Sequence, residues 1–273
     1  MGSAHAAIEP GTIAEFEPLR TWMVILMLAG GAAWLYRVVL FNRFGPRYGY
    51  RLETVEARGS NIIDLVMRPI DRRMMYEPGT FVFLRVPDLE SHRKELHPFS
   101  ISSSPVDRDL RVSIRTVGDF TQQLPALKPG AQLDVYGPFG GFTSHRYAKF
   151  RRIVCIGAGI GITPFLGMLA FELSNHDFRR IWLYYVVRDD ADAVYDAEIR
   201  QTYLQAESFI DYSLWQTSRD GRITAARVNS DVALEGYAVM LCGQLRFVAD
   251  LSRQFRALGV PRRRIITEEL EFR

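Results

Sequence analysis

The hydrophobic pattern of this chain changes near Lys149, and the change separates two parts that cannot belong to one kind of sheet. Before it, apolar and polar residues alternate in short runs separated by Gly and Pro, a pattern typical of half-buried β-strands. Strands are expected at residues 51–56, 61–68, 80–86, 110–115 and 132–136. Because no helix intervenes, we expect residues 48–148 to form an antiparallel, six-stranded β-barrel.

Beyond Lys149, continuous apolar runs alternate with segments of helical length. The runs predict buried strands at 152–156, 181–187, 210–215 and 238–242, and the segments predict helices at 164–173, 193–205 and 247–258. Strands that alternate with helices are typical of a doubly wound parallel sheet. Residues 149–273 are therefore expected to form an α/β domain, and the whole chain an α+β multidomain protein.

A third feature precedes both domains: residues 21–36 carry no charged side chain, and the apolar character continues to residue 41. A helix of this length rises about 30 Å, the thickness of the hydrocarbon core of a bilayer. We expect residues 1–20 to be a tail and 21–41 a transmembrane helix; a buried core helix is the alternative. Basic residues follow the apolar run, so the positive-inside rule places the bulk of the chain in the cytoplasm. They are Arg37, Arg43, Arg47 and Arg51.

Composition argues against several classes of function. The 34 basic and 31 acidic residues leave a formal charge of only +3, and the notable basic run is Arg262–Arg264, so nucleic acid is not an expected partner. Two cysteines occur, Cys155 and Cys242, without the spacing of a metal site or a disulfide scaffold. We expect no metal centre and a reducing compartment.

A glycine-rich run lies between the first strand and the first helix of the second domain. It holds Gly157, Gly159 and Gly161, and Thr163 and Pro164 follow where the helix begins. Glycines at such a turn allow positive φ and let backbone N–H groups approach a diphosphate, while proline suits the first helical turn. The spacing G-x-G-x-G differs from the usual dinucleotide fingerprint. The run predicts a dinucleotide site.

Arginines follow the next two strands of this domain. Arg188 comes after strand 181–187, and Ser218 and Arg219 come after strand 210–215. An arginine where NAD-binding proteins have an acid favours a ligand with a 2′-phosphate, hence NADPH over NADH, with NADH still possible. The alternative is that both arginines are simply solvated.

The barrel contains two further candidate segments. Arg115 ends a strand, and Gly118 and Thr121 in the following turn can present N–H groups to a second diphosphate, that of FAD. Phe99 can stack on a flavin ring, and the Ser100 hydroxyl can hydrogen-bond its N5 edge. The alternatives are an N-cap in the turn and a loop with one core aromatic residue.

The order of these motifs resembles the ferredoxin–NADP reductase-like superfamily, specifically the dehydrogenase half of ferric reductases and NADPH oxidases. The resemblance covers about residues 50–273 and rests on the tetrad His97-Pro98-Phe99-Ser100, the glycine run, Ser218-Arg219, Cys242-Gly243 and a Phe near the end of the chain. It implies an NAD(P)H-dependent oxidoreductase that passes electrons from NADPH through FAD to a one-electron acceptor.

The resemblance also implies roles for single residues. The tetrad His97–Ser100 would contact the flavin, and Ser218 and Arg219 would bind the 2′-phosphate. Cys242 and Gly243 would lie beside the nicotinamide, and Phe272 would cover the flavin ring. Ser100, Cys242 and Phe272 are therefore the expected catalytic residues. The chain departs from the family pattern at Gln244, where proline is usual, and at Asp119-Phe120.

The family's haem-bearing membrane bundle has no counterpart in this sequence. None of the five histidines lies in residues 21–41, and a transmembrane haem needs axial histidines. We expect a membrane-anchored reductase that works with a separate haem-bearing subunit or with a haem domain missing from this chain. Two alternatives stay open: a soluble reductase of the ferredoxin or flavodoxin type with residues 21–41 buried, and a non-catalytic assembly subunit that retains the fold.

Overall fold

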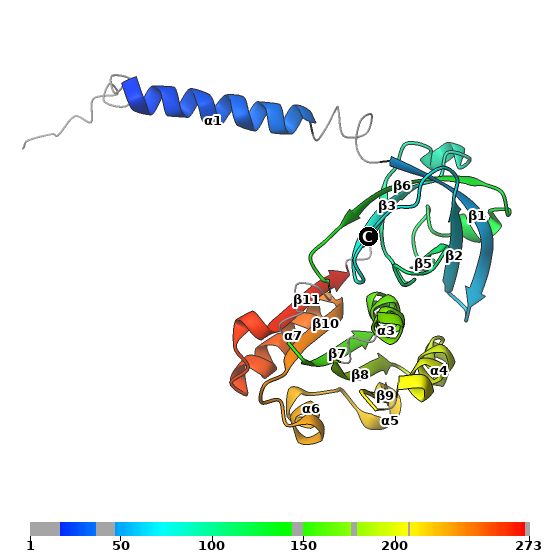
Figure 1. Cartoon of the computed structure of the whole chain (residues 1–273), viewed down its shortest axis with the longest axis vertical. Helices are drawn as coiled ribbons and strands as arrows, with labels where there is room; N and C mark the ends of the chain where they lie inside the picture. Colours follow the sequence, from blue (N-terminus) through cyan, green and yellow to red (C-terminus); the bar gives the residue numbers. More distant parts are fainter. Residues whose placement is uncertain (1–16, 37–46, 144–149, 176–178, 207, 271–273) are drawn as a thin grey trace, which may run out of the picture. The chain divides into compact units, whose positions relative to one another are not determined.

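The computed structural model describes residues 17–36, 47–143, 150–175, 179–206 and 208–270. The chain divides into two compact units, Met1–Arg47 and Tyr48–Arg273 (Figure 1). The second unit contains both the antiparallel and the parallel sheet, each with its own hydrophobic core. Phe272 lies outside the described residues, so its expected position over the flavin stays a prediction.

The first unit contains one described helix, α1, from Glu17 to Leu35. Its apolar side chains, including Trp22 and Met27, are exposed, and none of the window Pro18–Leu35 is buried. By length and composition this helix can cross a bilayer. It begins four residues before the expected start at Thr21, because Pro18 suits the first turn of a helix.

The antiparallel sheet has six strands, as expected, in the order β4-β3-β6-β1-β2-β5. Their bounds are β1 Arg47–Arg58, β2 Ile62–Pro69, β3 Phe81–Arg85, β4 His97–Ser100, β5 Leu110–Arg115 and β6 Gln132–Phe139. An antiparallel bridge between Ile101 and Val112 brings the two edge strands together, so the sheet curves into a half-barrel. Its interior holds apolar side chains from every second position, such as Leu65 and Met67 of β2.

Strand β4 was not expected from the periodicity. It has four residues, and Pro98 lacks an N–H group, which confines proline to edge strands. Its pairing with β3 sets Phe81 opposite Ser100 and Phe83 opposite Pro98. The tetrad predicted to bind flavin is therefore held on a strand and not on a free loop.

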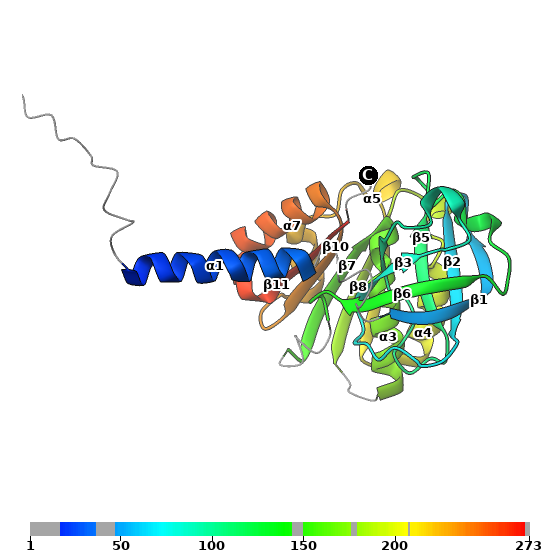
Figure 2. The same ribbon diagram turned by 90° about the horizontal axis from the view of Figure 1, so that it is seen from above.

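In the second sheet, neighbouring strands run parallel, in the order β11-β10-β7-β8-β9. Its strands are β7 Arg152–Ala158, β8 Arg180–Val187, β9 Ile210–Gln216, β10 Ala238–Gln244 and β11 Ile265–Leu270. The helices around it are α3 Thr163–Asn175, α4 Asp196–Ala206, α5 Thr217–Asp220, α6 Ala225–Val232 and α7 Leu245–Ala257. Separate cores lie on its two faces, one with α3 and α4 and the other with α6 and α7 (Figure 2). The doubly wound domain is therefore present, with β11, α5 and α6 in addition to the expected elements.

A buried carboxylate joins the half-barrel to the parallel-sheet domain. The Oδ1 atom of Asp64, in β2, accepts hydrogen bonds from the hydroxyl groups of Ser113 at 2.6 Å and Tyr195 at 2.7 Å. Arg58 donates from Nε to Oδ2 at 2.9 Å and supplies the opposite charge. Because Tyr195 directly precedes α4, the two domains meet on this carboxylate. A buried charge is tolerated when it is paired and hydrogen-bonded in this way.

Two further contacts cross the same boundary. Arg111 of β5 makes a bidentate ion pair with Glu198 of α4, with N–O distances of 2.6 and 3.0 Å. Gly167 of α3 lies so close to the barrel that a Cβ atom there would be 2.5 Å from the carbonyl oxygen of Ser103. These contacts determine how the domains meet, and hence the shape of any cavity between them.

We expect Tyr195→Phe to lower the free energy of unfolding by about 1–2 kcal/mol, because Asp64 loses one donor in a site that water does not reach. Urea denaturation followed by fluorescence measures the change. Tyr212→Phe is the matched control, because the Tyr212 hydroxyl donates at 2.6 Å to Asp196 within one domain. If the two variants lose equal stability, the buried hydrogen bond between the domains contributes no more than a hydrogen bond within one domain.

Candidate functional site

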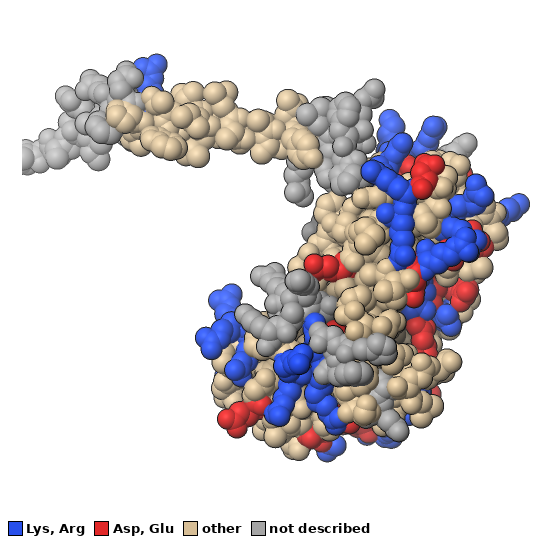
Figure 3. Space-filling model, in the orientation of Figure 1, with Lys and Arg blue, Asp and Glu red and all other residues tan. Residues whose placement is uncertain are grey.

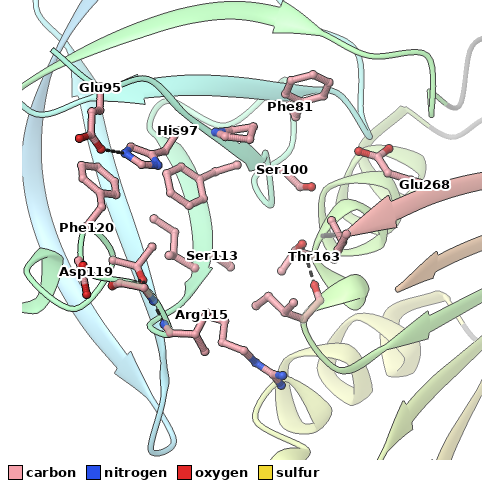
Figure 4. A pocket seen from close by; sticks show the side chains of 18 of the residues that line it. Phe81, Glu95, His97, Ser100, Ser113, Arg115, Asp119, Phe120, Thr163 and Glu268 are labelled. Atoms are coloured by element: carbon pink, nitrogen blue, oxygen red, sulfur yellow. Dashed lines mark hydrogen bonds and ion pairs between the residues drawn. The ribbon is translucent and has the colours of Figure 1, made fainter. Parts of the chain in front are cut away.

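A cavity of about 730 Å³ lies where the half-barrel meets the parallel sheet (Figure 4). The barrel contributes the residues around β4 and the end of β5, and the parallel-sheet domain contributes Ile160, Thr163 and the end of β11. All four residues of the tetrad His97–Ser100 line it. Arg115, Gly118 and Thr121 line it as well, so the barrel residues predicted from separate motifs are brought together.

Aromatic rings form one wall of this cavity. The imidazole of His97 stacks on the ring of Phe120, with centroids 3.8 Å apart and an interplanar angle of 13°. Phe99 lies nearly parallel to Phe120 at 6.3 Å. Phe120 occupies one of the positions where the sequence departs from the family pattern, and its buried ring supports the imidazole of His97 at the cavity wall. Planar ligands stack well on aromatic rings.

A carboxylate that the sequence reasoning missed holds the His97 ring. The Oε2 atom of Glu95 lies 2.9 Å from Nε2 of His97 and 3.0 Å from Nδ1 of His92, and all three residues line the cavity (Figure 4). Hydrogen bonds from His92 and then from His97 lower the pKa of Glu95. The spacing E-x-H at the start of a short strand is the signal that identifies this pair.

The turn after β5 is built differently from the expectation. The Oγ1 atom of Thr121 accepts hydrogen bonds at 3.0 Å from the backbone N–H groups of Val117 and Gly118. The Gly118 N–H group is thus satisfied within the turn, by a side chain that follows it and not by an N-cap, which would accept from later N–H groups. Arg115 extends the other way, since its Nη2 atom would lie 3.3 Å from a Cβ atom at Gly159. The cation that ends β5 therefore reaches the glycine run.

The glycine run forms the turn between β7 and α3 through a short 3-10 helix, Gly159–Ile162. Gly159 has φ of +55°, a conformation that side chains disfavour. A Cβ atom at Gly161 would lie 2.4 Å from the carbonyl oxygen of Cys242, so that glycine is required for packing against β10. Thr163 turns its hydroxyl to the carbonyl of Ile160 at 2.9 Å, and its neighbour Pro164 is buried in the first turn of α3.

A second cavity of about 990 Å³ follows the carboxyl ends of the parallel strands. It shares Arg115, Ile160 and Leu270 with the first cavity, so the two spaces adjoin. Its basic lining residues are Arg115, Arg188, Arg222 and Arg246. The carboxyl ends of parallel strands are where open α/β sheets bind their ligands.

Ser218 and Arg219 lie apart from the lining of this cavity. Arg219 is 65% exposed, and its guanidinium group pairs with both carboxylate oxygens of Asp220 at 2.9 Å. Arg222, three residues further along, does line the cavity and was not singled out from the sequence. The arginine that the family pattern indicates and the arginine that faces the cavity are therefore different residues.

Cys242 is fully buried at the end of β10 and lines neither cavity. Its sheet partners are Gly157 of β7 and Glu268 of β11. Burial raises the pKa of the Cys242 thiol, which is therefore neutral. Gly243 continues β10 with φ of +159°, and its Cβ position would be 3.0 Å from Ala158.

Glu268 is the most unusual acid of the site, and the sequence reasoning missed it. It lies on β11 at the cavity wall opposite His97 (Figure 4). Desolvation raises the pKa of this half-buried carboxyl to about 7. Strongly shifted acids in a cavity are candidates for handling protons. Within the described residues, no group of three or more His, Cys, Asp or Glu side chains could hold a metal ion.

Two family models match the chain, one in the half-barrel domain and one in the parallel-sheet domain. An FAD-binding domain matches residues 47–130, and an oxidoreductase NAD-binding domain matches residues 155–253. The chain therefore has the domains of an NAD(P)H-dependent FAD oxidoreductase. The first cavity is formed mainly by the FAD-binding domain, and the second by the NAD-binding domain.

Curated relatives include NADPH oxidases. NADPH oxidase 1 of Mus musculus is 29% identical over 64% of this chain, and a respiratory burst oxidase homolog of Arabidopsis thaliana is 30% identical over 57%. The alignments cover 32% and 18% of those proteins, so the chain spans less than a third of each. Among solved structures, flavohemoglobin from Malassezia yamatoensis with bound FAD and heme has a TM-score of 0.72 and 21% identity. That match covers 96% of this chain and 70% of the flavohemoglobin, and it establishes the shared fold.

The pKa of Glu268 predicts a pH dependence of stability. Because the pKa is raised to about 7, the folded state keeps a proton that the unfolded state releases above the ordinary glutamate range. The stabilisation is complete at low pH and is lost as the pH rises through about 7. Between pH 5 and 8 we expect the unfolding free energy of flavin-free protein to fall by roughly 1–2 kcal/mol, after allowance for solvent screening.

Glu268→Gln should remove this fall, and chemical denaturation at several pH values measures it. Glu269→Gln is the matched control, since Glu269 is the exposed neighbour on the same strand. A pH dependence that persists in Glu268→Gln would assign the effect to another group.

Proposed function

The chain belongs to the ferredoxin–NADP reductase-like superfamily, as a dehydrogenase unit of the NADPH oxidase type, and we propose that it passes electrons from NADPH through FAD to a one-electron acceptor at a membrane. The observation that carries this proposal is the pair of adjoining cavities that share Arg115, Ile160 and Leu270. Their volumes of about 730 and 990 Å³ are typical of small-molecule sites. Two cofactors bound there would meet at the shared residues.

The residues of the first cavity fit a flavin. Phe99 and the stacked pair His97 and Phe120 offer flat surfaces for an aromatic ring system, and Arg115 offers positive charge for a diphosphate. When bound, the flavin accepts a hydride from nicotinamide and releases electrons singly. Glu95 fixes the orientation of the His97 ring through the hydrogen bond to Nε2.

The residues of the second cavity fit a nicotinamide dinucleotide. The turn Gly159–Ile162 brings backbone close to the ligand space next to Arg115. We assign the 2′-phosphate to Arg222, with Arg188 as the second cation, because both line the cavity. Arg219 would contribute only by exchanging its carboxylate partner Asp220 for the phosphate. Charge-assisted bonds from arginine to phosphate favour NADPH over NADH.

The residues that would transfer protons lie at the edge of the cavity where the two domains meet. Ser100 and Glu268 line it from opposite domains, and at neutral pH Glu268 can hold a proton on its carboxyl group. Cys242 would have a positioning role, because its carbonyl oxygen packs closely on Gly161 and so holds the end of β10 against the glycine run. Phe272 would cover the flavin until nicotinamide displaces its ring.

The relatives and α1 support a proposal for the acceptor and the location. NADPH oxidase 1 is a curated relative of this chain, and one flavohemoglobin of the same fold binds heme. We propose that α1 anchors the chain as a single-pass membrane protein with its bulk in the cytoplasm, and that electrons leave to a haem group on a separate subunit or domain. The exposed apolar side chains of α1 favour this arrangement over a soluble reductase.

The purified protein should bind one FAD and oxidise NADPH with ferricyanide as acceptor. Phe99→Ala combined with Ser100→Ala should lower flavin occupancy, because the cavity loses a stacking surface and a polar contact. Flavin absorbance per protein and ferricyanide reduction measure the effect. Phe255→Ala on α7 is the control for loss of a buried ring, since Phe255 lies in the core between α7 and the parallel sheet and lines neither cavity. Protein without flavin in the wild type would support a non-catalytic subunit instead.

The assignment of the 2′-phosphate predicts different effects for two neighbouring arginines. Arg222→Ala should lower kcat/KM for NADPH by about tenfold to a hundredfold and leave NADH use nearly unchanged. Arg219→Ala should have a smaller effect, because Arg219 already pairs with Asp220. Steady-state kinetics with both nucleotides compare the two variants. A larger NADPH loss in Arg219→Ala would return the role to the residue that the family pattern indicates.

A further inference from the structure

Exposed apolar side chains gather at one end of the half-barrel. In the described part of Tyr48–Arg273, seven large apolar side chains are exposed, and three of them lie on two loops that precede β3 and β5. Met75 is 78% exposed, Val106 54% and Ile70 40%. The other four are single residues elsewhere: Val117, Leu204, Leu245 and Leu258. Single exposed apolar residues are ordinary, whereas a group of them marks an interaction surface.

The strand register places both loops at the same end of the barrel. The first loop leaves β2 at Pro69, which is paired with Tyr50 near the start of β1. The second loop enters β5 at Leu110, which is paired with Met67 near the end of β2. Both loops therefore lie at the end of the barrel where β1 begins.

Hydrogen bonds hold the two loops together as one surface. Arg73 donates from Nη2 to the carbonyl oxygen of Pro105, and the Tyr76 hydroxyl donates to the carbonyl oxygen of Ser104 at 2.8 Å. The backbone N–H group of Met74 donates to the Tyr50 hydroxyl at 3.2 Å. The apolar side chains thus project from a braced part of the fold.

Arginines are interleaved with these apolar side chains. We call the surface the loop face and define it by Ile70, Arg72, Arg73, Met75, Val106 and Arg108, all of them exposed. Figure 3 shows basic side chains gathered at this end of the barrel. The acids nearest in sequence are Asp71 and Asp107, and the carboxylate of Asp107 accepts the N–H group of Ser104 at 2.8 Å. The six residues of the loop face therefore present three cations, and the exposed acids of the same two loops are Asp71, Glu77 and Asp107.

The loop face is also the end of the barrel to which α1 is tethered. α1 ends at Leu35 and β1 begins at Arg47, so the chain between them spans at most about 40 Å. A bilayer that holds α1 is therefore within reach of the start of β1 and of the loops beside it.

We propose that the loop face docks on the anionic surface of the bilayer that α1 enters. Met75, Val106 and Ile70 would insert among the headgroups, and the arginines would pair with lipid phosphates while their stems stay in the apolar region. Each basic residue near an anionic surface contributes on the order of 1 kcal/mol, an effect that salt weakens. The docking gives the reductase unit one orientation at the membrane. It rests on the proposed anchoring by α1.

The test uses the full chain in vesicles of phosphatidylcholine with or without phosphatidylserine. The fluorophore NBD is attached to cysteine in Met75→Cys, and Leu204→Cys on α4 is the control with a similarly exposed site. The native thiols, Cys155 and Cys242, are both buried, so the label reports the introduced position. We expect a blue shift and brighter emission at position 75 in phosphatidylserine vesicles, reversed by high salt, and no change at position 204.

Arg72→Glu with Arg108→Glu should abolish the response at position 75 without changing NADPH–ferricyanide activity, since neither residue lines a cofactor cavity. Flotation of the same samples reports the anchor separately. A chain that does not float shows that α1 is no anchor. A chain that floats while position 75 stays in water overturns the docking, and so does an equal response in vesicles without phosphatidylserine.

Discussion

The structure depends on one buried charge, the Asp64 carboxylate, because it lies on the boundary that shapes both cavities. It receives two hydroxyl donors and the guanidinium of Arg58, and one of those hydroxyl groups belongs to the other domain. The bidentate pair of Arg111 and Glu198 continues the contact. Polar contacts of this kind are directional, so they fix the angle between domains more closely than apolar packing does. The residues that line the cavities are correctly placed only when this angle is kept.

Sequence patterns predicted the elements that have a regular apolar pattern. Five barrel strands show apolar and polar residues in alternation, the parallel strands β7 to β10 are continuous apolar runs, and α1 lies in an uncharged run. β4 and β11 did not follow, for a common reason. His97 and Pro98 begin one strand and Glu268 and Glu269 lie in the other, and such residues are rare in strands unless neighbours accommodate them. Their conformation is set by edge pairing with β3 and β10, a tertiary effect that no local window contains.

The residues of the candidate site also differ in how well the sequence predicts them. The tetrad and the glycine run could be predicted, because adjacent residues in the sequence are enough to indicate a backbone turn or a stacking ring. The reason for Gly161 could not, since its constraint is the carbonyl oxygen of Cys242, which is eighty-one positions later. Arg222 and Glu268 could not be predicted for a similar reason, because only the folded structure shows that they face a cavity. Arg219, which the sequence pattern indicated, pairs with the adjacent Asp220 instead.

The last strand has a consequence for how the protein is made. Glu268 and Leu270 of β11 complete the wall of a cavity whose other side comes from residues 81–121. Chains are synthesised from the N-terminus, and domains generally fold in that order. A nascent barrel on the ribosome therefore has an open cavity, even when its own sheet is complete. The cavity can be enclosed only after β11 has emerged, well after the barrel strands.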